Sequence, residues 1–103
     1  MKNISPNEMR NLLEQDKNAV LIDVRSPEEC SEGMIKGAEN INLFDPTFME
    51  KVSKMDKSKN YYMICRSGNR SGTACGAMAQ MGFGTLYNLS GGMMAWDGEV
   101  VYP

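Results

Sequence analysis

Residues 61–71 read Tyr-Tyr-Met-Ile-Cys-Arg-Ser-Gly-Asn-Arg-Ser, a short apolar run that turns into a basic loop at Cys65. Four apolar residues in a row are typical of a strand buried on both faces of a sheet. After the loop, apolar residues recur at helical spacing from Ala74 to Met81, which predicts a helix over residues 70–81. The sequence therefore predicts a strand, a loop and a helix in succession, with Cys65 at the carboxyl end of the strand.

Segments typical of strands and of helices alternate along the rest of the chain. Strands are expected at residues 19–22, 38–42 and 85–89. Helix starts are predicted at Ser5-Pro6 and Ser26-Pro27, each with a glutamate that closes a capping box, at Asp45-Pro46, and after Gly91-Gly92. This alternation favours an α/β fold with a mainly parallel sheet.

The bulk composition bounds the protein class. A chain of 103 residues with 42% hydrophobic and 23% charged residues is expected to form a single domain over residues 1–103. The net charge of −2 gives no reason to expect nucleic acid or an anionic membrane as a partner. No apolar run approaches the roughly 20 residues that cross a bilayer, and no signal-peptide core follows Met1, so a cytoplasmic location is expected.

The cysteines, Cys30, Cys65 and Cys75, are odd in number and widely spaced, unlike a secreted disulfide framework. The chain holds no histidine and no two cysteines separated by two residues (Cys-x-x-Cys), so we expect no metal site and no cofactor. The missing histidine also excludes activation of a cysteine by a histidine within this chain. A catalytic cysteine must here be activated by other groups.

The loop after Cys65 offers such groups. A strand end that leads into a helix start presents free backbone amides and the positive end of the helix dipole. Arg66 and Arg70 add positive charge, so we expect a lowered thiol pKa at Cys65. The loop can curl into an anion-binding nest, in which Gly68 supplies conformational freedom and Ser67 and Ser71 supply hydroxyl donors.

Four motifs in order resemble the rhodanese family over nearly the whole chain. The motifs are Leu21–Arg25, Glu29 with Gly33–Ile41, the loop Cys65–Ser71, and Gly82-Phe83 with Leu89–Trp96. The resemblance implies a central five-stranded, mainly parallel sheet flanked by helices. It also implies a sulfurtransferase in which Cys65 carries a persulfide, taking sulfur from a donor such as thiosulfate or a persulfide. The acceptor would be cyanide, a thiol or a protein cysteine, and the loop residues Arg66, Ser67, Gly68, Asn69, Arg70 and Ser71 would bind the transferred sulfur.

The chain departs from the family pattern at two positions. Met34 stands where family members usually carry histidine, and because it lies outside the loop we expect a consequence for packing. Cys30 stands where many members have an aromatic residue, and we expect a looser wall beside that helix.

Several residues near the loop are open to two interpretations. Asp23, at the end of a strand, either tunes the site or makes structural hydrogen bonds. Arg25 and Glu29 are expected to pair across the turn into the next helix. Arg66 is expected to recognise an anionic donor, and Arg70 to shape the loop and its field.

Cys30 and Cys75 are interpreted as small structural residues, with a relay thiol as the alternative. Trp96 is expected to be a packing anchor.

Two other functions remain open at this stage. Cysteine-dependent phosphatases and arsenate reductases also place a thiolate in an anion-binding loop before a helix. Their usual pattern has five residues between cysteine and arginine, whereas four separate Cys65 from Arg70. The second alternative is a non-catalytic module that uses the fold to bind a protein.

Overall fold

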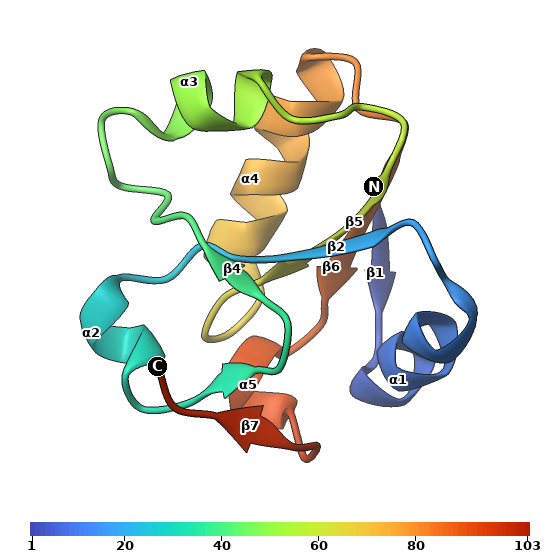
Figure 1. Ribbon diagram of the computed structural model, residues 1–103, viewed down its shortest axis with the longest axis vertical. Coiled ribbons are helices and arrows are strands. Elements are labelled where there is room, and N and C mark those ends of the chain that lie inside the picture. Colours follow the sequence, from blue (N-terminus) through green and yellow to red (C-terminus); the bar gives the residue numbers. More distant parts are fainter.

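The computed structural model describes residues 1–103 and places the predicted strand of the Cys65 motif at the centre of a parallel sheet. The sheet has five strands in the order β1-β6-β5-β2-β4, and every neighbouring pair is parallel (Figure 1). The strands are β1 (Lys2–Ile4), β2 (Ala19–Asp23), β4 (Glu39–Asn40), β5 (Asn60–Ile64) and β6 (Thr85–Leu89). This architecture confirms the predicted α/β fold.

Helices cover both faces of the sheet, because its central strands are apolar on both sides. The longer helices are α1 (Pro6–Gln15), α3 (Phe48–Ser53) and α4 (Asn69–Gln80). Two short helices, α2 (Pro27–Cys30) and α5 (Gly92–Ala95), lie near the loop that follows β5 (Figure 1). A small antiparallel pair of strands, β3 (Met34–Ile35) with β7 (Val100–Val101), joins the C-terminal segment to the turn after α2.

Alternation along β5 divides the core in two. Tyr61, Met63 and Cys65 belong to the larger apolar cluster, which includes residues of α3 and α4. Tyr62 and Ile64 point to the other face and join the smaller cluster around α1 and α5. Because side chains alternate along a strand, this parity places the side chain of Cys65 on the face covered by α4.

Both predicted capping boxes are present. The hydroxyl of Ser5 accepts the Glu8 amide at 3.1 Å, and the hydroxyl of Ser26 accepts the Glu29 amide at 3.3 Å. The predicted helix start at Asp45-Pro46 was wrong by two residues, since α3 begins at Phe48. The Asp45 carboxylate instead accepts the backbone amide of Thr47 at 2.8 Å, which holds the turn before the helix.

Strand β1 was not predicted from the sequence. Of its three residues only Ile4 is apolar, so no hydrophobic run marks it. It forms the edge of the sheet beside β6, with Asn3 opposite Asn88. The strand predicted over residues 38–42 is shorter in the structure, where β4 comprises only Glu39 and Asn40. The longest helix, α4, has 12 residues, fewer than a bilayer-spanning helix requires.

Candidate active site

Cys65 follows directly after β5, and its sulfur lies in a cradle of hydrogen-bond donors. The residue is fully buried, whereas Arg66, Ser67 and Asn69 of the loop around it are exposed. The backbone amide of Gly68 donates to Cys65 Sγ at 3.0 Å, and the hydroxyl of Ser71 lies 3.2 Å from the same atom. The loop thus curls around the sulfur, as an anion-binding nest does.

Gly68 makes this curl possible. Its φ is +102°, a left-handed backbone conformation that residues other than glycine rarely adopt. A Cβ at this position would also lie 3.3 Å from the carbonyl oxygen of Leu89. Gly68 is the N-cap of α4 and offers no side-chain cap, so the first amides of the helix remain free for the sulfur.

Hydrogen bonds set the acidity of Cys65. Burial raises the pKa of the thiol, but donation from the Ser71 hydroxyl and from the backbone amides of Ser71, Gly68 and Ser67 outweighs it. The net result is a pKa below the ordinary value for cysteine. The charges of Arg66 and Arg70 were expected to contribute, whereas the lowering arises chiefly from the hydrogen bonds of the cradle.

Arg70 is engaged by a partner on another helix. Its guanidinium meets the Glu29 carboxylate of α2 in two parallel contacts of 2.7 and 2.8 Å. The pair lowers the pKa of Glu29 to about 2. It ties the first turn of α4 to α2, so Arg70 shapes the loop through an ion pair that sequence spacing did not indicate.

The predicted ion pair between Arg25 and Glu29 is therefore wrong. Arg25 instead binds the Asp23 carboxylate, with its Nη2 at 2.8 Å from Asp23 Oδ2, and both side chains are buried. The same guanidinium donates to the carbonyl oxygens of Gly33, at 2.8 Å, and Glu29, at 3.3 Å. Asp23 ends β2 and Arg25 lies two residues later, in the turn that leads to α2, so the carboxylate accepts both the backbone amide and the side chain of Arg25 within this turn.

Asp23 lies on the strand beside β5 but does not contact the sulfur of Cys65. It is the last residue of β2 and sits opposite Ile64, which precedes Cys65. Its carboxylate is occupied by the side chain and backbone amide of Arg25. This environment favours a structural hydrogen-bonding role for Asp23 over tuning of the site, since its carboxylate makes no contact with Cys65.

The Gly91-Gly92 turn supports the loop after Cys65, a contribution that was not predicted from the sequence. It brings α5 so close that the amides of Met93 and Met94 donate to the carbonyl oxygens of Cys65 and Arg66, at 2.9 and 3.0 Å. A Cβ on Gly92 would lie 2.6 Å from the Arg66 carbonyl carbon. The paired glycines were the available signal, because close backbone approach requires a residue without a side chain.

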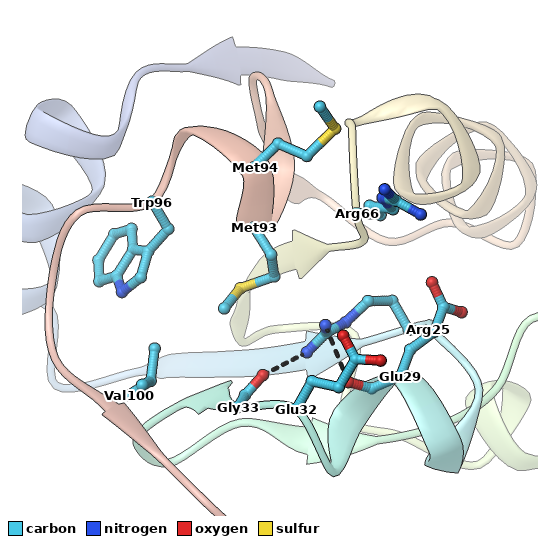
Figure 2. Close-up of a pocket in the computed structure, with 9 residues that line it drawn as sticks. All are labelled: Arg25, Glu29, Glu32, Gly33, Arg66, Met93, Met94, Trp96 and Val100. Carbon is cyan, nitrogen blue, oxygen red and sulfur yellow. Dashed lines mark hydrogen bonds between the residues drawn. The ribbon is translucent and has the colours of Figure 1, made fainter.

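A pocket of about 360 Å³ lies beside the loop, between α2 and α5 (Figure 2). Figure 2 shows Met93 and Trp96 on one side of it, and Arg25, Gly33 and Glu32 on the other. Nine residues line the pocket: Arg25, Glu29, Glu32, Gly33, Arg66, Met93, Met94, Trp96 and Val100. Arg66 is exposed there and makes no ion pair. Its charge is therefore available to a molecule that enters the pocket.

The other two cysteines are buried and poorly ionised. Burial raises the pKa of Cys30 to about 11, helped by the nearby Asp23 carboxylate. Burial likewise raises the pKa of Cys75 to about 11. Cys75 packs in the larger core cluster on the same face of α4 as Ser71, one turn further along. These surroundings are those of structural cysteines.

Two further positions from the sequence analysis lie outside the cradle. Met34 is buried in β3, opposite Val101. Trp96 packs against the smaller core cluster, below the guanidinium of Arg10, and its Nε1 donates to the Glu99 carbonyl oxygen at 3.2 Å. Its position agrees with a packing anchor that also forms part of the pocket wall.

Comparison with known proteins assigns the family. The family model of the rhodanese-like domain matches residues 5–99. The chain is a rhodanese-like domain. It is 46% identical over 99 residues to "Putative sulfurtransferase YtwF" of Bacillus subtilis, covering 96% of this chain and 93% of that protein. It is 29% identical over 100 residues to thiosulfate sulfurtransferase GlpE of Pseudomonas aeruginosa, covering 97% and 86%.

Solved structures support the same fold for this rhodanese-like domain. It superposes on a rhodanese-like domain protein from Staphylococcus aureus with a TM-score of 0.87 and 31% identity, covering 100% of this chain and 99% of the other. A rhodanese-related protein from Thermoplasma volcanium gives a TM-score of 0.84 with 27% identity, covering 98% of each chain. Both the fold and the family therefore agree with the resemblance in the sequence motifs.

Proposed function

We propose that this rhodanese-like domain is a sulfurtransferase that carries sulfur as a persulfide on Cys65. The observation that supports the proposal most strongly is the cradle around the buried sulfur of Cys65. This sulfur accepts a hydrogen bond from the Gly68 amide at 3.0 Å and lies 3.2 Å from the Ser71 hydroxyl. Such a set of fixed donors stabilises a thiolate before reaction and an anionic persulfide after it.

The first half-reaction loads the cysteine. The Cys65 thiolate attacks the outer, sulfane sulfur of thiosulfate and forms a new S–S bond. The S–S bond of thiosulfate breaks, and sulfite leaves with the electron pair. The negative charge of the resulting persulfide resides on the terminal sulfur, where the amides of residues 66–71 and the amino end of α4 favour it.

The second half-reaction discharges the terminal sulfur. A nucleophilic acceptor attacks it, and the S–S bond to Cys65 breaks with its electron pair returning to Sγ. Cyanide becomes thiocyanate in this step, and a thiolate becomes a persulfide. We propose that the cellular acceptor is a thiol or a protein cysteine and that the reaction takes place in the cytoplasm.

Arg66 and the pocket beside it supply donor recognition in this proposal. The guanidinium is exposed, unpaired and carried by the residue that follows the nucleophile. An arginine presents several N–H donors to an oxyanion, which suits the sulfonate end of thiosulfate. The opposite wall contains Glu29, but Arg70 already engages that carboxylate.

Turnover with thiosulfate and cyanide tests the proposal, with thiocyanate as the measured product. We expect Cys65→Ala to abolish turnover and to keep a folded protein. Cys75→Ala is the matched control, because Cys75 is also buried but has a poorly ionised thiol. Wild-type turnover in Cys65→Ala would contradict the proposed nucleophile.

The same preparation separates the alternative functions. A phosphatase would hydrolyse a small aryl phosphate faster than the Cys65→Ala control. A non-catalytic binding module would show no transfer from either thiosulfate or a persulfide donor. We expect no phosphatase activity, because four residues rather than five separate Cys65 from Arg70, and Arg70 already pairs with Glu29. We expect sulfur transfer rather than binding alone, because a cradle that lowers the thiol pKa serves a reactive sulfur.

A further inference from the structure

A buried asparagine lies behind the cradle and faces the same serine hydroxyl as Cys65. Asn88, on β6, is 5% exposed. Its Nδ2 donates to the carbonyl oxygen of Gly68 at 3.0 Å and to Asn3 Oδ1 at 3.0 Å. Its Oδ1 accepts from the hydroxyl of Ser71, the same hydroxyl that faces Cys65 Sγ.

The orientation of the Asn88 amide is fixed by its neighbours. The carbonyl oxygen of Gly68 can only accept, so the atom of Asn88 that faces it must be the amide nitrogen. The amide oxygen must then face Ser71. Because Ser71 is fully buried, no bulk water replaces either partner.

The Ser71 hydroxyl has a single proton and two acceptors. While Cys65 is a thiol, its S–H can donate to Ser71 Oγ, and Ser71 can donate to Asn88 Oδ1. When the thiol proton leaves to the solvent, the thiolate attracts the Ser71 proton, because hydrogen bonds to charged acceptors are stronger. Asn88 Oδ1 then loses its donor, and an unsatisfied buried acceptor is costly.

We propose that Asn88 is a positioning residue that acts through Ser71, competing with Cys65 for its proton and so setting how readily the thiolate forms. Loading with sulfur ends the competition, since the charge moves to the terminal sulfur and the Ser71 proton can return to Asn88. Asn88 therefore disfavours the thiolate relative to both the thiol and the persulfide. This inference rests on the proposed function, because it concerns the same cysteine, Cys65.

The charged and titratable groups around Cys65 stay constant in a test of Asn88. They are Arg66 in the loop, Arg70 and Cys75 on α4, Glu29 on α2, which pairs with Arg70, and Asp23 at the end of β2, which pairs with Arg25. None of these side chains forms a hydrogen bond with Asn88 or Ser71. A shift in the titration of Cys65 on changing Asn88 would therefore arise from the hydrogen-bond network.

The pH dependence of Cys65 alkylation tests the inference in four proteins: wild type, Asn88→Leu, Ser71→Ala and the double variant. Leucine matches asparagine in size and has no acceptor. We expect Asn88→Leu to lower the thiol pKa by roughly one unit, Ser71→Ala to raise it, and the double variant to match Ser71→Ala. Asn88→Val, which suits a strand, is measured in parallel and should shift the pKa in the same direction as leucine.

A purely structural role for Asn88 makes the opposite prediction. Loss of the hydrogen bond to Gly68 would then loosen the cradle and raise the thiol pKa in both apolar variants. A raised pKa, no shift, or an equal shift with and without the Ser71 hydroxyl would overturn the inference. The titration needs no sulfur transfer, so its failure is distinguishable from failure of the proposed function.

Discussion

Arg70 and Glu29 form a two-point ion pair, with contacts of 2.7 and 2.8 Å, although they lie 41 positions apart in the sequence. The pair joins the first turn of α4 to α2, next to the loop that holds Cys65. Because Glu29 also accepts from the Ser26 amide, it contributes to a helix cap and to the loop support at once. The stability of the site is thereby linked to the ionisation of one carboxylate.

We predict that Glu29→Gln destabilises the protein by about 1–2 kcal/mol at pH 7. The expected loss is modest because both side chains are partly exposed, so water screens the ion pair. The folded state lowers the pKa of Glu29 from 4.5 to about 2. This stabilisation is therefore full above pH 4.5 and is lost as the pH falls towards 2. Urea unfolding at pH 7 and at pH 3 measures it, with Glu28→Gln as the control. An equal gap between wild type and Glu29→Gln at both pH values would contradict the assignment.

Arg66→Ala should weaken the use of an anionic donor. The variant loses one charge-assisted contact to thiosulfate, which corresponds to a rise of roughly tenfold in apparent KM, with a smaller change in kcat. Steady-state kinetics with varied thiosulfate measures the effect. Lys17→Ala removes the same charge at an exposed position before β2 and should leave KM unchanged. An unaltered KM in Arg66→Ala would refute donor recognition by this side chain.

Gly92→Ala should damage both stability and activity. The new Cβ would press on the Arg66 carbonyl group, and the φ of +55° disfavours alanine. We expect a loss of about 2–3 kcal/mol in the free energy of unfolding and reduced sulfur transfer. Gly76→Ala is the control, since Gly76 lies within α4 with nothing near its Cβ position. That variant should be about 0.5–1 kcal/mol more stable than wild type.

The three cysteines should differ in reactivity near neutral pH. Cys65 has a lowered pKa, while the pKa values of Cys30 and Cys75 are raised to about 11. We predict that limited iodoacetamide treatment of the folded protein labels Cys65 alone, as mapped by peptide mass. Labelling of Cys75 in the native protein at a rate similar to Cys65 would support the relay alternative.

Local features of the structure could be predicted from the sequence where short-range chemistry determines them. Each such feature depends only on residues a few positions apart. Examples are the serine–proline starts of α1 and α2, the apolar run of β5 and the glycine in the loop. Edge strand β1 could not be found in this way, because it depends on pairing with β6 rather than on its own hydrophobicity.

The contacts that support the site could be identified only from the folded structure. The ion pair between Glu29 and Arg70 and the contact of Asn88 with Ser71 join segments far apart in the chain. No spacing rule relates such residues. The arginines of the loop suggested a charge effect on Cys65, whereas the lowered pKa depends on hydrogen bonds whose donors the folded loop brings together.

Intact mass after incubation with thiosulfate, and again after cyanide, tests the central claim most directly. We expect a gain of one sulfur atom, about 32 Da, that maps to Cys65 and is lost on addition of cyanide. Cys65→Ala should gain nothing. An adduct that persists in Cys65→Ala, or a folded wild-type protein that takes up no sulfur from either thiosulfate or a persulfide donor, would contradict the account.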